Sequence, residues 1–151
     1  KDRGDVPYCL LLMSLVKDVE RLGDYAKNLA EVPEAGGAPI PDDDNGRELR
    51  IVRSAVEATF GAVSEVFATS DRKRALGLIQ EGRKINRRCD ELVATVAKST
   101  YDAATTTSMV LGARYYKRIE SHLLNILSGV VMPLHKIDYY DEKALDTDDD
   151  S

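Results

Sequence analysis

Apolar residues recur every three or four positions along most of this chain, and this spacing places them on one face of an α-helix. The pattern predicts a first helix over roughly residues 6–31, where Asp5 precedes Val6 and Pro7 as an N-cap followed by a proline in the first turn. The apolar positions of this helix are Leu12, Leu15, Val19, Leu22, Ala26 and Leu29.

The next stretch, residues 32–46, has no helical pattern. It contains three prolines, Gly36, Gly37 and the acidic run Asp42–Asp44. Proline and glycine interrupt helices, and a run of like charges is usually solvated. We therefore expect a linker here.

A second helix is predicted from about residue 47 to the cluster Thr69–Asp71, which ends it and offers an N-cap to a third helix. A connection this short makes the two helices antiparallel neighbours. The predicted buried positions are Val52, Val56, Thr59, Val63 and Val66 in the second helix, and Ala75, Leu78, Gly82, Ile85, Cys89, Leu92 and Val96 in the third.

A fourth helix follows, with a buried face predicted at Gly112, Tyr115, Ile119, His122, Ile126 and Val130. The run Thr105–Thr107 lowers helix propensity, so the pattern does not define where this helix starts. Pro133 is expected to end or kink it near Met132. Residues 139–151 form an acidic tail, which we expect to be disordered beyond Asp146.

These four stretches predict an all-α protein, an antiparallel bundle of four long helices. A chain of 151 residues can bury roughly 70% of the surface that its unfolded form exposes. Aromatic residues make up only 6% of the chain and Trp is absent, so the helices are expected to pack through Leu, Val, Ile and Ala.

Charge, hydropathy and cysteine content indicate which kinds of partner and which cellular compartment to expect. The net charge of −5 does not favour nucleic acid as a partner. The longest apolar run, Tyr8–Met13, is far shorter than the ~20 residues that a membrane-spanning helix needs, so we expect no direct membrane insertion. Cys9 and Cys89 both fall at apolar helical positions, where a free thiol behaves as a small hydrophobic group. Free thiols of this kind favour a reducing compartment, so we expect the protein in the cytoplasm. Lys1 is not a natural start, so we also expect residues upstream of it.

An internal repeat relates the first and fourth helices. With an offset of 97 residues, the segment VERLGDYAKNLAEV at 19–32 aligns with YKRIESHLLNILSG at 116–129. Arg21 then meets Arg118, and Asn28 meets Asn125. The repeat indicates duplication of a three-helix unit, with the last helix of a truncated first unit at residues 1–31 and a complete unit at residues 47–138.

The first helix carries a string that resembles the E-R-x-G-D-x-x-x-N-[IL]-A-E motif closing each three-helix repeat of the PhoU family, the phosphate-uptake regulators. Its matching residues are Glu20, Arg21, Gly23, Asp24, Asn28, Leu29, Ala30 and Glu31. The resemblance extends over roughly residues 6–130. It implies a regulator of phosphate uptake that acts in the cytoplasm by contact with a phosphate transporter or a sensor kinase, and that does not act as an enzyme.

The resemblance also implies a metal site at Glu20 and Asp24, since some family members bind iron or zinc clusters through this pair. Two carboxylates do not complete the ligand set of a transition metal, and the pair can equally form a solvated acidic edge. The fourth helix departs from the motif, because Lys117 and Ser121 stand where the motif has its acidic residues. Any metal is therefore expected at Glu20 and Asp24 and not at the matching positions of the fourth helix.

Two alternative functions stay open on sequence grounds. The chain can be a PhoU-like cytoplasmic domain of a membrane sodium/phosphate cotransporter, or a histidine phosphotransfer bundle that uses His122. A basic stripe on the third helix, at Arg72, Arg83 and Arg87, is either a solvated face or a docking strip for an acidic partner. The apolar belt at residues 10–13 is wider than one helix face needs, so we expect a homo-oligomer in which a second copy covers it.

Overall fold

The computed structural model describes residues 5–131, with side chains described from Cys9 onward. It contains four helices: α1 (Asp5–Ala30), α2 (Asp44–Thr69), α3 (Arg72–Val96) and α4 (Ala103–Val131). No strand occurs among these residues, so the all-α prediction is confirmed. The predicted break at Pro133 and the acidic tail at residues 139–151 lie outside the described part of the chain.

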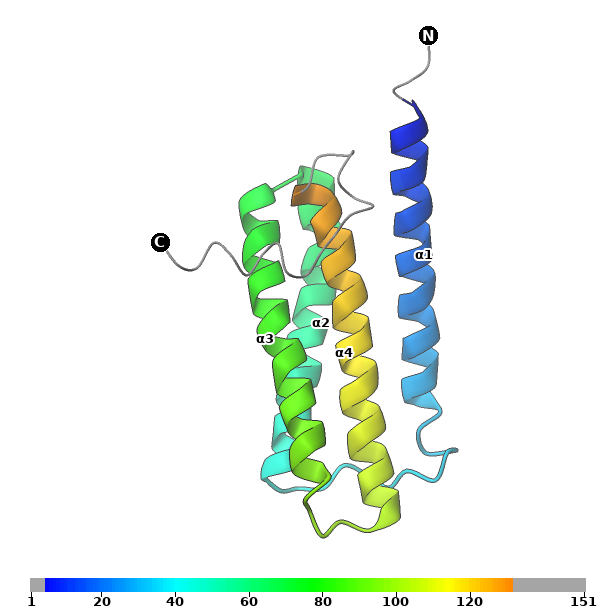
Figure 1. Ribbon diagram of the computed structural model, residues 1–151, viewed down its shortest axis with the longest axis vertical. Helices are drawn as coiled ribbons and strands as arrows, with labels where there is room; N and C mark the ends of the chain where they lie inside the picture. Colours follow the sequence, from blue (N-terminus) through cyan, green and yellow to red (C-terminus); the bar gives the residue numbers. More distant parts are fainter. Residues whose placement is uncertain (1–4, 132–151) are drawn as a thin grey trace.

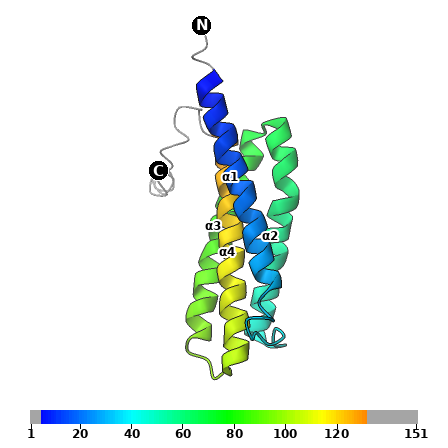
Figure 2. The ribbon, with the colours of Figure 1, turned by 90° about the vertical axis from the view of Figure 1, so that its right-hand side faces the viewer.

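Helices α2, α3 and α4 pack against one another, whereas the backbone of α1 approaches only α4 among the described helices. Figure 1 shows α1 along the side of α4 that faces away from α3, and in Figure 2 α1 lies in front of α4. Successive helices run in opposite directions (Figure 1), and the short connection between α2 and α3 makes those two antiparallel neighbours as predicted. The molecule is thus a three-helix bundle with a fourth helix attached to one of its members.

The core of the bundle follows the predicted faces of α2 and α3. All five predicted positions of α2 are buried, and in α3 only Leu78 is partly exposed, because its neighbour Ile79 is the buried residue. Ile119 of α4 is buried in the same cluster as Val63 of α2. A second cluster, near the loop that joins α3 to α4, contains Leu49 and Met109.

The prediction for α1 is wrong in part. Val19 and Ala26, which were assigned to the buried face, are exposed, whereas Asp18 is buried with a relative exposure of 8%. Only Leu22 of the predicted set is fully buried. The reason is that α1 contacts a single helix, which covers one narrow stripe of its surface.

The linker is shorter than predicted, because α2 begins at Asp44 and not near residue 47. The side chain of Asp43 accepts a hydrogen bond of 2.8 Å from the backbone N–H of Gly46, which makes it the N-cap of α2. Gly46 is buried against the preceding turn, and a Cβ there would lie 1.8 Å from the carbonyl oxygen of Pro41. The acidic run read as solvated linker therefore starts a helix.

None of the described helices combines the length and the apolar character that crossing a membrane requires. The two cysteines differ in their surroundings. Cys89 is buried, as predicted, and burial raises the pKa of its thiol to about 12. Cys9, which the sequence placed at an apolar helical position as a small hydrophobic group, is exposed.

Candidate functional site

A polar cluster joins α1 to α4 in the middle of their contact. The Asp18 carboxylate lies 2.7 Å from Nδ1 of His122, and the Asn125 side-chain amide donates a hydrogen bond of 3.3 Å to the same Asp18 oxygen. Tyr25 stacks on the His122 ring, with the ring centroids 5.7 Å apart and the planes inclined by 24°. A buried carboxylate needs such partners, because an unpaired charge at the interface would oppose packing.

The contacts in this cluster are reciprocal under the internal repeat. The offset of 97 residues makes Asp18 equivalent to Tyr115 and Tyr25 equivalent to His122. The structure brings together Asp18 with His122, and also Tyr25 with Tyr115, whose rings lie 6.2 Å apart. Two equivalent antiparallel helices packed around an approximate two-fold axis would give this pattern.

These contacts give His122 a structural role at the α1–α4 interface. Its side chain is 20% exposed, one ring nitrogen is engaged by Asp18, and one ring face is covered by Tyr25. Phosphotransfer through His122 stays a prediction from the sequence, and no contact described here favours it.

The predicted metal ligands lie apart from this cluster. Glu20 and Asp24 are both exposed, on the side of α1 opposite to buried Asp18 and Leu22. Asp24 lies 4.0 Å from Arg21, an exposed pair of small energetic weight. Within residues 5–131 no group of three potential metal-ligating side chains occurs. These residues thus supply at most two carboxylates to a metal, and the assignment of iron or zinc stays a prediction.

The α4 residues that match Glu20 and Asp24 in the repeat, Lys117 and Ser121, contact α3. Lys117 forms an ion pair of 2.7 Å with Asp90 of α3, and the Ser121 hydroxyl accepts a 3.1 Å hydrogen bond from the side chain of Asn86, also on α3. The two departures from the motif therefore attach α4 to its neighbour. A cation and a hydroxyl in these places do not favour a second metal site.

An apolar groove of about 610 Å³ runs between α1 and α2, with α4 as its floor. Val19 of α1 and Phe60 and Phe67 of α2 form its walls, and Leu123 and Ile126 of α4 lie beneath them. No charged side chain of the described residues lines it. The sequence did not predict this groove, because it placed Val19 in the core.

Sequence reasoning also missed Glu120, which is fully buried at the centre of the bundle. Its Oε1 lies 3.0 Å from the hydroxyl of Thr59, and its Oε2 has no hydrogen-bond partner among the described residues. Burial raises the pKa of this carboxyl to about 7. Gly82 of α3 makes the space for it, since a Cβ there would lie 2.6 Å from Oε1. The signal was present in the helical spacing, which places Glu120 in line with Tyr116 and Leu123.

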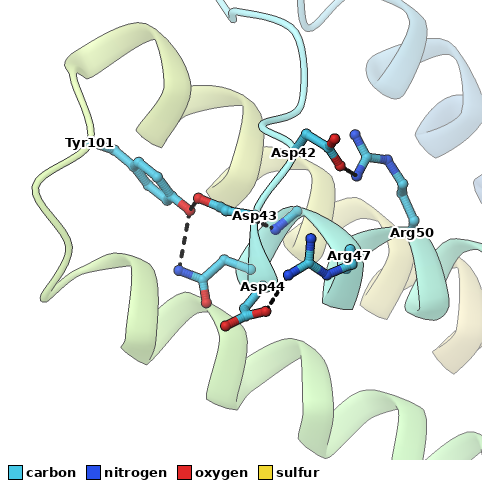
Figure 3. A network of polar contacts seen from close by, with 8 residues as sticks. Asp42, Asp43, Asp44, Arg47, Arg50 and Tyr101 are labelled. Carbon is cyan, nitrogen blue, oxygen red and sulfur yellow. Dashed lines mark hydrogen bonds and ion pairs between the residues drawn. The ribbon is translucent and has the colours of Figure 1, made fainter.

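A further polar network fixes the start of α2 to the loop before α4 (Figure 3). The Tyr101 hydroxyl donates to the Asp43 carboxylate and accepts a 3.2 Å hydrogen bond from the Asn45 side chain. The bond from Tyr101 lowers the pKa of Asp43 and raises the pKa of Tyr101. Arg47 and Arg50 pair with the neighbouring Asp44 and Asp42. The network consists of a helix cap and exposed ion pairs, so we regard it as structural.

Comparison with known proteins gives one partial similarity. A segment of 51 residues, 32% of this chain, is 37% identical to a protein of Zymomonas mobilis subsp. mobilis described as a phosphate-specific transport system accessory protein PhoU homolog. The matched segment spans 22% of the length of that relative. No known family profile and no solved structure matches the chain. The chain is therefore similar to a PhoU homologue over part of its length.

Proposed function

We propose that this protein is a PhoU-like regulator of phosphate uptake that acts in the cytoplasm by contact with protein partners and does not catalyse a reaction. The observation that carries the proposal is the 37% identity to a PhoU homologue over 51 residues, which agrees with the motif resemblance in α1. A phosphate transporter and a sensor kinase are the partners that the resemblance implies.

The chemistry of the described side chains supports a binding role more than a catalytic one. The one histidine among them with a defined environment is engaged by Asp18 and Tyr25. The pKa of about 12 at Cys89 keeps that buried thiol in its protonated, unreactive form near neutral pH. The remaining large features are an apolar groove and a basic helix face, both of which are surfaces for contact.

The basic face of α3 is the surface that we propose for an acidic partner; it comprises the predicted stripe of Arg72, Arg83 and Arg87 together with the neighbouring Lys73 and Arg88. Part of it is used within the chain: Arg72 donates to the backbone of Val131 over 2.7 Å, and Arg88 pairs with Glu48 over 2.6 Å. Lys73 and Arg87 are exposed. Exposed cations of this kind raise the association rate and orient the encounter more than they add affinity.

A binding measurement tests both parts of the proposal, which are contact with a phosphate transporter or sensor kinase and the use of the α3 face for that contact. The purified protein is passed over the immobilised cytoplasmic subunit of the phosphate transporter and over the sensor kinase of the same organism. We expect binding to one of them, and an association rate reduced about tenfold at low salt by the double variant Lys73→Glu, Arg87→Glu. The control Lys17→Glu, Lys98→Glu makes the same charge change at exposed positions outside this face.

The two parts can fail separately. Absence of binding to both proteins would contradict the regulatory role. If the α3 double variant and the control weaken binding equally, the regulatory role is retained, but the α3 face is excluded as the contact surface.

A further inference from the structure

A separate cavity lies between the linker that joins α1 to α2 and the facing sides of α2 and α4. We call it the linker pocket. Its volume is about 320 Å³, which is within the range of small-molecule sites, ~300–1,000 Å³. All of its lining residues fall between Leu29 and Tyr116, so the linker and the described helices supply every wall.

The walls of the linker pocket are held in place by contacts within the chain. The backbone N–H of Ala38 donates to the carbonyl oxygen of Ala104 over 3.1 Å, and the Ser108 hydroxyl donates to the carbonyl oxygen of Ala38. Arg50 of α2 donates to the carbonyl oxygen of Ile40 over 3.2 Å. The linker is thus attached to both α4 and α2. A pocket that is already formed costs less to order when a ligand binds.

The lining of the linker pocket divides into an apolar part and a cationic part. Leu29, Ile40 and Leu49 supply apolar surface, and Arg50 and Arg53 supply two guanidinium groups. The two arginines are three residues apart on α2, so they lie on one face of that helix. No carboxylate of the described residues lines the pocket. The lining therefore suits a ligand with an apolar body and a negative charge.

Both arginines are paired only with exposed carboxylates outside the lining. Arg50 lies 3.5 Å from Asp42, whose side chain is 92% exposed (Figure 3). Arg53 donates through its Nε to Glu57 over 2.8 Å, and both of these side chains are 61% exposed. Exposed ion pairs contribute little to stability, so an anion in the pocket can compete for these guanidinium groups.

Tyr116 adds a third donor to the cationic part of the pocket. Its hydroxyl forms no hydrogen bond with another residue of the described chain, although Tyr116 lines the pocket. Burial raises the pKa of this hydroxyl, and the charge of the nearby Arg53 acts against that rise. The hydroxyl is therefore protonated near neutral pH, and its hydrogen can be donated to an anionic ligand.

We propose that the linker pocket binds a small phosphate monoester. The organic group of the ester would pack on Leu29, Ile40 and Leu49, where burial of apolar surface favours an ester over inorganic phosphate. The phosphoryl oxygens would accept hydrogen bonds from Arg50, Arg53 and the Tyr116 hydroxyl. Two guanidinium groups and a hydroxyl suit a doubly charged phosphate better than a singly charged carboxylate, because each guanidinium can donate two parallel hydrogen bonds to phosphate.

A titration of the full 151-residue protein with phenyl phosphate, followed by ¹H–¹⁵N NMR spectra, tests the site and the ligand class. We expect saturable shifts centred on the backbone amides of Ala38, Ile40 and Gly112. Inorganic phosphate lacks the organic group, benzyl alcohol lacks the charge, and benzoate lacks the phosphate. Each should bind about tenfold more weakly than phenyl phosphate. Equal affinity for inorganic phosphate or for benzoate would overturn the assignment to a phosphate monoester.

Substitutions of the donors test which side chains hold the phosphate. The double variant Arg50→Gln, Arg53→Gln should weaken the binding of phenyl phosphate about tenfold, and Tyr116→Phe about threefold. The control Arg47→Gln, Arg74→Gln makes the same charge change in two other exposed ion pairs, with Asp44 and Glu65, outside the pocket. We expect this control to bind as the wild type does, and the dispersion of the spectra shows that each variant is folded.

Three results would overturn the proposal. The first is an absence of shifts at ~10 mM phenyl phosphate, which corresponds to affinity too weak for a site. The second is a set of shifts confined to the apolar groove, for example at Gly23 and Gly61. The third is an equal loss of affinity in the Arg50, Arg53 variant and in the control. None of these results would bear on contact with the transporter or the kinase.

Discussion

At the scale of single residues, the packing around Glu120 decides its protonation state. The Thr59 hydroxyl lies 3.2 Å from the carbonyl oxygen of Ala55 and 3.0 Å from Oε1 of Glu120. A hydroxyl has only one hydrogen to donate, so both bonds form together only if the Glu120 carboxyl is protonated and donates to Thr59. This agrees with the pKa of about 7 that burial gives the group.

The raised pKa makes stability depend on pH. Because the folded state holds the Glu120 proton more tightly than the unfolded state, the contribution is complete below about pH 4.5 and is lost as the pH rises to about 7. A difference of this size corresponds to about 3 kcal/mol of unfolding free energy. Urea denaturation between pH 5 and 8 should therefore show a smaller loss for Glu120→Gln than for the wild type. The exposed control Glu91→Gln should follow the wild type, and equal slopes for Glu120→Gln and wild type would refute the account.

Substitution of single residues also tests whether Glu20 and Asp24 bind a metal. If protein purified without chelator contains iron or zinc, elemental analysis should find it lost in the double variant Glu20→Ala, Asp24→Ala and kept in His122→Ala. Occupancy in one chain should be low, because two carboxylates leave most of the coordination sphere to water. Metal that survives the double variant but disappears with His122→Ala would place the site at the α1–α4 polar cluster.

At the scale of elements, α1 is the helix most dependent on a few contacts, since only one narrow stripe of it is covered. Asp18→Ala removes the acceptor shared by His122 and Asn125, at a cost of about 1–3 kcal/mol. Hydrogen exchange should then accelerate along α1, with little change at the centres of α2, α3 and α4. Asp24→Ala, on the exposed side of the same helix, is the control. Equal acceleration in all four helices would mean that α1 is not a separately opening element.

The comparison of α1 with α2 and α3 shows what helical periodicity can predict. In α2 and α3 one apolar stripe meets the core, so every predicted position except Leu78 is buried; next to Leu78, the buried residue is Ile79. In α1 two apolar stripes lie side by side, and the sequence does not say which one a neighbouring helix covers. Asp18 and Glu120 were missed for a related reason: a charged side chain reads as solvated until its partners, His122 or Thr59, are located in space.

The start of α2 and the apolar groove also depend on tertiary contacts that a local sequence pattern does not show. Asp43 was read as part of a solvated acidic run because its partners, the Gly46 amide and the Tyr101 hydroxyl, depend on how the chain turns. His122 was predicted on the inward face of α4, and the structure places it there against α1. The groove could not be predicted, since it arises from the gap between α1 and α2 and not from a local pattern.

At the scale of the whole molecule, the described helices form a bundle whose uncovered surfaces, an apolar groove and a basic helix face, are suited to binding. The apolar groove, lined by α1, α2 and α4, and the basic face of α3 lie on different helices. The similarity to a PhoU homologue covers 51 residues. The regulatory role of the chain is our proposal from that partial similarity.

The measurement that tests the regulatory role most directly is the rate of radiolabelled phosphate uptake in the source organism, with and without the gene. We predict that deletion removes the difference in uptake between low and high external phosphate, and that expression of the full protein restores it. Uptake that responds to external phosphate equally in both strains would contradict the role in phosphate regulation.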